Sequence, residues 1–308
     1  MVRTPLHVAP FEKLATHPQY ANYLAGSPIA PINVEVSPSG ICQASCEFCW
    51  YANGDLGGHR KVFLDLAVLT DLITACAEMG VRSITWTGGG DPSLYPSIGA
   101  AVAYVAATGM RQGMFTNALA MPRFAPSAMD WIRITMTDKP HNVESIQRMR
   151  EAKTLGFAFN YSGEQDDPYL RRTLDLAESV KADYVQVRPA LPFHGRTVEI
   201  HPPNFGHPLM QVTRYKFTEA QHKHQYAECE GYHFVPFVWE DGDVDVCAYM
   251  RGHDGYTLGN LYRRDFRGIL EAAPKSVPVA HDCQVCCRNH EINRAIHSGR
   301  ALLDRDFP

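Results

Sequence analysis

The sequence predicts an α/β fold in which six strand–helix units come first and a smaller module follows. Runs rich in β-branched and aromatic residues alternate with helical runs as far as residue 188, as a parallel sheet covered by helices requires. After Pro189 the composition changes to a segment rich in proline and histidine, which breaks this rhythm. With 308 residues, 45% of them hydrophobic, the chain can bury a sizeable core.

The strands are expected at residues 33–37, 83–87, 112–116, 131–136, 157–161 and 184–188. Helices are expected near residues 64–79, 96–108, 141–154 and 168–181, with a weaker helical signal after the third strand. Ligand sites in barrels built this way collect at the C-terminal ends of the strands. The residues that follow each strand are therefore the first candidates for a functional site.

A cysteine-rich loop follows the first expected strand. Cys42, Cys46 and Cys49 are spaced Cys-x3-Cys-x2-Cys. Three thiolates on a short loop can hold three corners of a [4Fe-4S] cube, and the missing fourth ligand leaves one iron open to a small molecule. A zinc site is the alternative, although structural zinc requires four closed positions and no fourth ligand lies nearby.

A glycine segment, Gly88, Gly89 and Gly90 followed by Asp91, comes directly after the second expected strand. Glycine lets a backbone approach a ligand closely. On its own, such a segment is typical of an ordinary turn. Its position downstream of the cysteine loop favours a ligand-binding role.

These two segments resemble the radical SAM superfamily, whose signature is Cys-x3-Cys-x2-Cys with an aromatic residue before the last cysteine, here Phe48. The resemblance implies a partial (β/α)6 TIM-like barrel, with Cys42, Cys46 and Cys49 as ligands of a [4Fe-4S] cluster. It also implies that the amino and carboxylate groups of S-adenosylmethionine (SAM) bind the fourth iron. Reductive cleavage of SAM then gives a 5′-deoxyadenosyl radical.

The same resemblance assigns Gly88, Gly89, Gly90 and Asp91 to SAM binding, because the family's segment, usually Gly-Gly-Glu-Pro, binds the methionyl ammonium through backbone polar groups. Aspartate replaces the usual glutamate here. Residues at other strand ends align with SAM-contacting positions of relatives, namely Asn117 (after Thr116), Thr135, Asn160, Ser162 and Arg188. Arginine suits bidentate carboxylate recognition, with a solvated surface position as the alternative for Arg188. For Asn117 and Thr135 the alternative is a local hydrogen bond at the strand end.

A domain boundary is expected after residue 192, so that 1–32 is a lead-in, 33–192 the barrel and 193–308 a C-terminal module. The histidines of residues 201–208 lack the i, i+4 pairing of a helical metal site, which favours a solvated or substrate-facing loop.

Four late cysteines form a second candidate set, Cys229, Cys247, Cys283 and Cys286. A hairpin of residues 232–239 and 243–246, with a turn at Asp241-Gly242, is expected to bring Cys247 to Cys229. The Cys-x2-Cys pair precedes an expected helix that includes Ile292 and Ile296.

This arrangement resembles the auxiliary-cluster region of SPASM and twitch radical SAM enzymes, with a spacing similar to that of aminocyclitol dehydrogenases. The shorter twitch form fits better, because cysteines for a further cluster are lacking. The resemblance implies a second [4Fe-4S] cluster on these four thiolates, and structural zinc is the alternative. Cys76 lies on a helical apolar face and is expected to be buried, while Cys287 is unassigned.

Charge and hydropathy limit the partners. The net charge of −4 argues against a broad basic field for nucleic acid without excluding a local patch. No apolar segment resembles a signal peptide or reaches the length of a membrane span. We expect a cytoplasmic protein without membrane contact, whose cysteines bind metal clusters rather than form disulfides.

The expected activity is that of a radical SAM enzyme, of oxidoreductase or isomerase/mutase type, acting on a small polar molecule or a modified nucleotide. A flavodoxin- or ferredoxin-like protein is the expected electron donor. Modification of a peptide or a nucleic-acid base is an alternative, although residues 1–32 are too short and proline-rich for a winged-helix peptide-recognition domain. A non-catalytic iron-sulfur or zinc protein is the alternative of another class.

Overall fold

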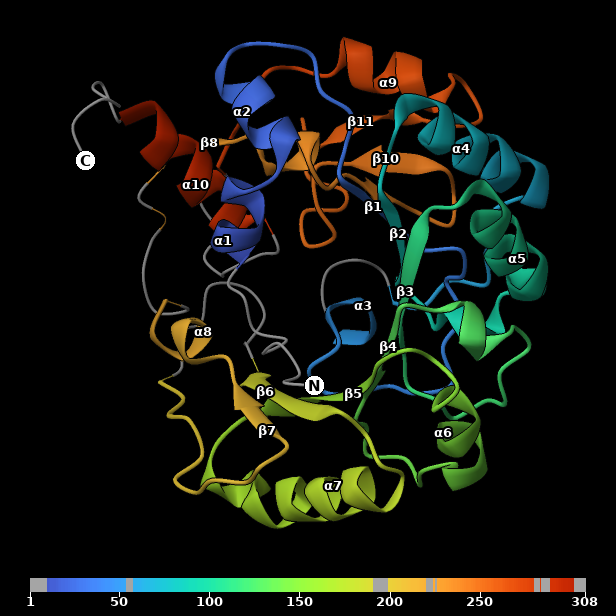
Figure 1. The fold of residues 1–308 in the computed structure, drawn as a ribbon, viewed down its shortest axis with the longest axis vertical. Helices are drawn as coiled ribbons and strands as arrows, with labels where there is room; N and C mark the ends of the chain where they lie inside the picture. The colour runs from blue at the N-terminus through green and yellow to red at the C-terminus, as the bar shows by residue number, and fades with distance from the viewer. Residues whose placement is uncertain are drawn as a thin grey trace.

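The computed structural model describes residues 10–53, 58–190, 199–219, 224, 226–279, 283 and 289–301. Within them, one sheet of ten strands runs in the order β11-β10-β9-β1-β2-β3-β4-β5-β6-β7. Figure 1 shows this sheet as an arc, with α4, α5, α6 and α7 along its convex side and α3 on its concave side. The molecule is therefore an α/β fold with a mostly parallel sheet, as predicted.

The parallel strands are β1 (Asn33–Val36), β2 (Ser83–Trp86), β3 (Arg111–Thr116), β4 (Trp131–Thr135), β5 (Leu155–Tyr161) and β6 (Tyr184–Pro189). The helices between them are α4 (Leu66–Met79), α5 (Ile98–Thr108), α6 (Val143–Met149) and α7 (Asp167–Ser179). Each overlaps its predicted range. Helix α6 is shorter than the predicted 141–154, and the β3–β4 connection contains a short 3-10 helix, Pro126–Ala128, where the helical signal is weak.

Helix α4 shows why these segments fold locally as they do. The Asp65 carboxylate accepts hydrogen bonds from the N–H groups of Ala67 and Val68 and caps the helix. Gly80 ends the helix with φ 83°, a conformation that glycine adopts without strain. The face between these caps packs into the core through Leu69, Leu72, Ile73 and Cys76. The prediction that Cys76 is buried is confirmed.

The other face of the strands, away from these helices, carries polar and aromatic residues. The Arg133 guanidinium lies 5.3 Å from the ring centre of Phe115, 5.6 Å from that of Trp131 and 5.4 Å from that of Tyr184. Glycine at position 113 makes this arrangement fit, because a Cβ there would lie 1.9 Å from the Trp131 ring. This layer forms the floor beneath the C-terminal strand ends.

The sheet continues past the predicted barrel on both edges. Strand β7 (Met210–Val212) pairs with β6, and β9 (Phe237–Val238) pairs with β1, both in parallel. The antiparallel strands β10 (Asp243–Asp245) and β11 (Thr257–Asn260) extend the edge beyond β9. The chain after residue 192 therefore shares a sheet with the chain before it, while the boundary itself stays a prediction.

The predicted hairpin strand 232–239 is too long. Residues Gly231–His233 form a 3-10 helix, η4, and the strand begins only at Phe237. Pro236 has no N–H to donate to a ladder, which explains why pairing starts after it. The expected turn at Asp241-Gly242 is present, and Gly242 has φ 83°.

The two ends of the described chain pack together. Helices α1 (Pro10–Ala15) and α2 (Pro18–Leu24) lie beside α10 (His290–Ala301), which is the helix predicted around Ile292 and Ile296 (Figure 1). The buried Glu230 carboxylate joins them, accepting hydrogen bonds of 2.5 Å from the hydroxyl of Tyr23 and from Nη2 of Arg300. The remaining elements are α3 (Trp50–Asn53), α8 (Arg214–Glu219), β8 (Glu228–Cys229), α9 (Phe266–Ala272) and β12 (Val277–Pro278).

Candidate active site

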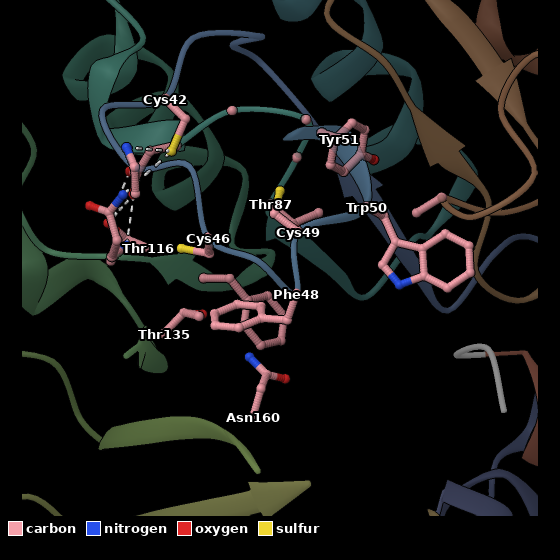
Figure 2. Close-up of a pocket in the computed structure, with 18 of the residues that line it drawn as sticks. Cys42, Cys46, Phe48, Cys49, Trp50, Tyr51, Thr87, Thr116, Thr135 and Asn160 are labelled. Carbon is pink, nitrogen blue, oxygen red and sulfur yellow. Dashed lines mark hydrogen bonds between the residues drawn. The ribbon is translucent and has the colours of Figure 1, made fainter. Parts of the chain in front are cut away.

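A cavity of about 230 Å³ opens at the C-terminal ends of β1 to β6. Nearly all of the residues that the sequence assigned to a cluster and to SAM line it, namely Cys42, Cys46, Phe48, Cys49, Gly88, Gly89, Gly90, Asp91, Asn117, Thr135, Asn160 and Arg188. Figure 2 shows the three thiol groups facing a common space, with Phe48, Thr135 and Asn160 on one side of it. Ser162 does not line the cavity: it is exposed, and its hydroxyl donates to Asp166.

The three thiols have different electrostatic surroundings. Burial raises the pKa of Cys42 to about 11 and that of Cys46 to about 12, and the neighbouring cysteines add to the increase for Cys46. Burial also acts to raise the pKa of Cys49, but hydrogen bonds from the His59 ring and from backbone N–H groups outweigh it and lower that pKa. Two N–H groups also approach the Cys42 sulfur, at 3.4 Å from Ala44 and 3.5 Å from Asn117.

The three thiols form a donor set that an iron-sulfur cluster can use. Within the described residues, no three His, Cys, Asp or Glu side chains converge closely enough to hold one metal ion. In a [4Fe-4S] cube each thiolate binds a different iron, so three cluster ligands need not converge on one point. Thiolates are also the ligands that such clusters take.

The glycine segment packs directly on the cysteine loop. A Cβ at Gly88 would lie 2.3 Å from Ser37 Oγ, and one at Gly90 would lie 2.2 Å from the Ile41 carbonyl oxygen. The Gly90 N–H donates to the Ser39 carbonyl over 2.9 Å. Gly88 and Gly90 are therefore required for contact between the two loops, in addition to the predicted close approach of a ligand.

Asp91 joins the ends of β2 and β3. Its carboxylate accepts hydrogen bonds from the Ser93 N–H (2.9 Å), the Thr116 hydroxyl (2.9 Å) and the Asn117 N–H (2.7 Å). Asp91 is buried, so these bonds offset the cost of removing its charge from water. The carboxylate holds the glycine segment in place through donors at the end of β3 and in the 3-10 helix Pro92–Leu94.

Residues 36–181 match the model of the Radical SAM superfamily, and this range contains both the three cysteines and the glycine segment. Residues 36–181 form a radical SAM domain. Members of this superfamily are enzymes that use SAM and a [4Fe-4S] cluster. No curated protein matches the chain.

Solved structures share the fold of the radical SAM domain and of part of the chain beyond it. Streptococcus suis SuiB bound to S-adenosylmethionine has a TM-score of 0.59 at 13% identity, over 86% of this chain and 72% of SuiB. SuiB bound to the precursor peptide SuiA has a TM-score of 0.58 at 12% identity, over 80% of this chain and 66% of SuiB. For anSMEcpe with bound AdoMet the TM-score is 0.54 at 11% identity, over 87% of this chain and 95% of the anSMEcpe chain.

At these identities the likeness concerns the fold alone. It agrees with a partial radical SAM barrel formed by the parallel strands. The match covers 66% of the SuiB chain in the complex with SuiA, so this chain spans slightly less than two thirds of the length of SuiB. None of the helices described is long and apolar enough to cross a membrane.

Two side chains at the ends of β5 and β6 interact. Arg188 Nε donates to Asn160 Oδ1 over 2.8 Å. The Asn160 Nδ2 atom is buried and has no partner among the residues described. Because Asn160 lines the cavity, a bound ligand with an acceptor atom there would satisfy this donor.

His59 is a site residue that sequence reasoning missed. Its Nδ1 lies 2.5 Å from the Gly89 carbonyl oxygen, and its ring also contacts the Cys49 thiol. Interaction with Cys49 raises the pKa of His59. No motif marks this histidine, because the loop that carries it packs against the glycine segment only in the folded chain.

The cavity wall also includes residues from the chain after the predicted boundary. Lys216 of α8 and Tyr249 line it, and the Tyr249 ring meets Trp50 edge-on with centres 4.9 Å apart. These residues come from regions without a recognisable motif. The cavity is therefore built jointly by the radical SAM domain and by later segments.

Three of the four late cysteines lie in one region. Cys229 and Cys247 are buried in a single apolar cluster, and Cys283 packs against it. Cys286 and Cys287 lie outside the described residues. Two unpredicted neighbours bond to these sulfurs: Asn293 Nδ2 donates to Cys229 over 3.2 Å, and His224 Nε2 lies 3.4 Å from Cys283.

Proposed function

We propose that the chain is a radical SAM enzyme that abstracts hydrogen from a small polar molecule or a modified nucleotide, giving oxidation or rearrangement. One observation carries this proposal: three thiols in the superfamily spacing line the same cavity as the glycine segment. A cluster bound there would supply the electron that divides SAM into methionine and a 5′-deoxyadenosyl radical.

The chain's own residues have distinct roles in this proposal. Cys42, Cys46 and Cys49 hold the cluster, and the backbone of Gly88 to Gly90 receives the methionyl part of SAM. Asn160 and Arg188 offer hydrogen-bond donors to SAM at the opposite wall. Phe48, Phe115 and Trp50 line the cavity and limit the entry of water to a reactive radical. Asn117 and Thr135 remain candidates for further SAM contacts, while Ser162 has no place in the lining.

The late cysteines are proposed to hold an auxiliary [4Fe-4S] cluster. Clustering of Cys229, Cys247 and Cys283 supports this proposal, with Cys286 as the fourth ligand. Four thiolates would close the cluster, so it would accept an electron from the substrate radical rather than bind the substrate. A structural zinc on the same thiolates is the alternative, because tetrahedral thiolate sites suit zinc as well as iron.

A cytoplasmic location and a flavodoxin- or ferredoxin-like electron donor follow from this chemistry, since cluster assembly and reductive cleavage both need reducing conditions. Modification of a peptide is the second candidate. The solved structure of SuiB with its precursor peptide supports it by similarity of fold. Mass spectrometry of peptide substrates would separate the two candidates, because only the second predicts a mass change on a peptide.

The first experiment is anaerobic purification, determination of iron and sulfide, and incubation with dithionite and SAM. Wild-type protein should form 5′-deoxyadenosine. The Cys46→Ala variant should lose this activity and about half of the iron of a two-cluster protein, because one of three cluster ligands is gone.

Cys76→Ala is the matched control, since Cys76 is fully buried on α4 and away from the cavity. It should retain iron and SAM cleavage. Cleavage retained in Cys46→Ala, or absent from the wild-type protein after reduction, would favour a non-catalytic metal protein instead.

A further inference from the structure

Glu240 is a buried carboxylate at the turn between β9 and β10, and its side chain is 1% exposed. It accepts hydrogen bonds from Arg251 Nη1 (2.8 Å), Arg60 Nη2 (3.2 Å) and the Ser37 hydroxyl (3.0 Å). Both guanidinium groups also bind the neighbouring Asp241. Two acids and two bases therefore form a group that is neutral as a whole.

Ser37 connects this group to the cavity. A carboxylate can only accept, so the Ser37 hydroxyl donates to Glu240 and keeps lone pairs for another donor. That donor is the Gly89 N–H, whose nitrogen lies 3.0 Å from Ser37 Oγ. Ser37 is fully buried, so water does not compete for these bonds.

The Gly89 backbone is fixed from both sides. Its N–H is bound to Ser37, and its carbonyl oxygen lies 2.5 Å from His59 Nδ1. Because a peptide group is planar and trans, the Gly88 carbonyl must point away from Ser37. Gly88 also has φ 152°, a conformation that other residues rarely adopt.

Anchoring of the hairpin turn alone does not account for these contacts. The arginine pairs of Glu240 and Asp241 suffice to hold the turn. The contact between Glu240 and Ser37 adds a link to a glycine that lines the cavity.

We propose that Glu240 is a positioning residue for SAM binding, which acts through Ser37 to orient the peptide groups on either side of Gly89. The inference rests on the proposed function, in which this segment binds SAM. It assigns to the C-terminal hairpin a part in the SAM site that lies outside residues 36–181.

The test compares Ser37→Ala, Glu240→Gln and the double variant with wild-type protein, all with reconstituted clusters. Ser37→Ala removes one hydroxyl and adds no atoms. Glu240→Gln keeps the volume, and its remaining oxygen can still accept from both arginines at the Oε1 position. Its NH2 group then replaces Oε2, so the Ser37 hydroxyl loses its acceptor there. The dissociation constant for SAM is measured by anaerobic equilibrium dialysis.

Each single variant should weaken SAM binding about tenfold, as expected for loss of one buried hydrogen bond. The double variant should bind like either single variant, because both substitutions break the same chain of contacts. Asp241→Asn is the control: it shares both arginines but lacks the contact with Ser37, and it should bind SAM within about twofold of wild type.

Amide hydrogen exchange tests the inference without SAM and without enzyme turnover. Amide hydrogen exchange in residues 84–94 should be faster in Ser37→Ala and Glu240→Gln than in Asp241→Asn, because the Gly89 N–H loses its fixed acceptor. Iron content should match that of wild type in all variants. Unchanged SAM affinity and exchange in the two variants would overturn the inference.

Loss of iron together with loss of SAM binding in Ser37→Ala or Glu240→Gln would also overturn the inference. The contact between Glu240 and Ser37 would then support the cysteine loop rather than the glycine segment. Wild-type protein that fails to bind SAM would refute the proposed function itself. This result would be recognised before any variant is compared.

Discussion

At Asn160, one buried polar atom of the cavity lacks a hydrogen-bond partner among the described residues. Its carbonyl oxygen is satisfied by Arg188, while its buried amide nitrogen has no partner within the described chain. A buried donor without an acceptor costs about 1–3 kcal/mol. A ligand acceptor at this position would remove that cost, which links the energetics of one residue to ligand binding.

Asp130 provides a prediction at the residue scale. Burial acts to raise its pKa, but hydrogen bonds from Lys153 and the Gln112 N–H, together with the charge of Arg111, outweigh this and lower the pKa. A lowered carboxyl pKa contributes stability above its unfolded value, and this contribution is lost as the pH falls through the folded pKa. Asp130→Asn should therefore destabilise the apoprotein by about 1 kcal/mol at pH 7, because both cations are exposed and screened.

The measurement is urea unfolding of wild type and variant at several pH values between 7 and 3. The difference should shrink toward acid pH. Asp254→Asn, at an exposed position, is the control and should change stability by less than about 0.5 kcal/mol. A difference that is constant with pH would contradict the assigned pKa shift of Asp130.

At the scale of elements, the sequence predicts the parallel strands well because runs rich in β-branched and aromatic residues alternate with helical runs. Strands β7 and β11 are not predicted, since Met210–Val212 and Thr257–Asn260 are short and acquire their conformation by pairing with strands already in the sheet. The cysteine loop and glycine segment are predictable from spacing. His59, Lys216 and Glu240 are not, because only packing between distant segments brings them to the cavity or its supporting contacts.

The fit between β3 and β4 leads to a prediction at this scale. Gly113→Ala would place a Cβ 1.9 Å from the Trp131 ring, which would have to move from its place beside Arg133. Overpacking of this kind costs about 1–3 kcal/mol. We expect a lower thermal midpoint and a lower free energy of unfolding in urea.

Gly206→Ala is the matched control, because a Cβ at Gly206 has no heavy atom within 4 Å and its φ is not positive. Its stability should stay within about 0.5 kcal/mol of wild type. Equal stability of the two alanine variants would mean that the Trp131 ring can move without cost.

At the scale of the whole molecule, the late segments complete the structure that the radical SAM domain begins. Strand β9 extends the sheet beside β1, Tyr249 and Lys216 line the cavity, and α10 packs on α1 and α2. Cys229 and Cys247 lie in an apolar cluster separate from the main core, and Cys283 packs against it. The two proposed metal sites, being in separate regions, should therefore respond independently to substitution.

Cys283→Ala tests this independence. The variant should contain about four iron atoms per chain where the wild type contains about eight, because the auxiliary cluster loses one ligand. Binding and cleavage of SAM at the first cluster should persist, while net oxidation of substrate should be lost. Iron content equal to wild type would indicate zinc or no metal at the late cysteines.

The pairing of β1 with β9 has a consequence for biosynthesis. Glu35 lies opposite Phe237, about 200 residues later in the chain, so one edge of β1 has no neighbour from the sheet while the intervening residues are translated. An open strand edge offers its N–H and C=O groups to any extended chain nearby. Newly made chains that stop before β9 would thus be prone to aggregate, and high-yield expression should depend on slow synthesis or on chaperones that cover this edge.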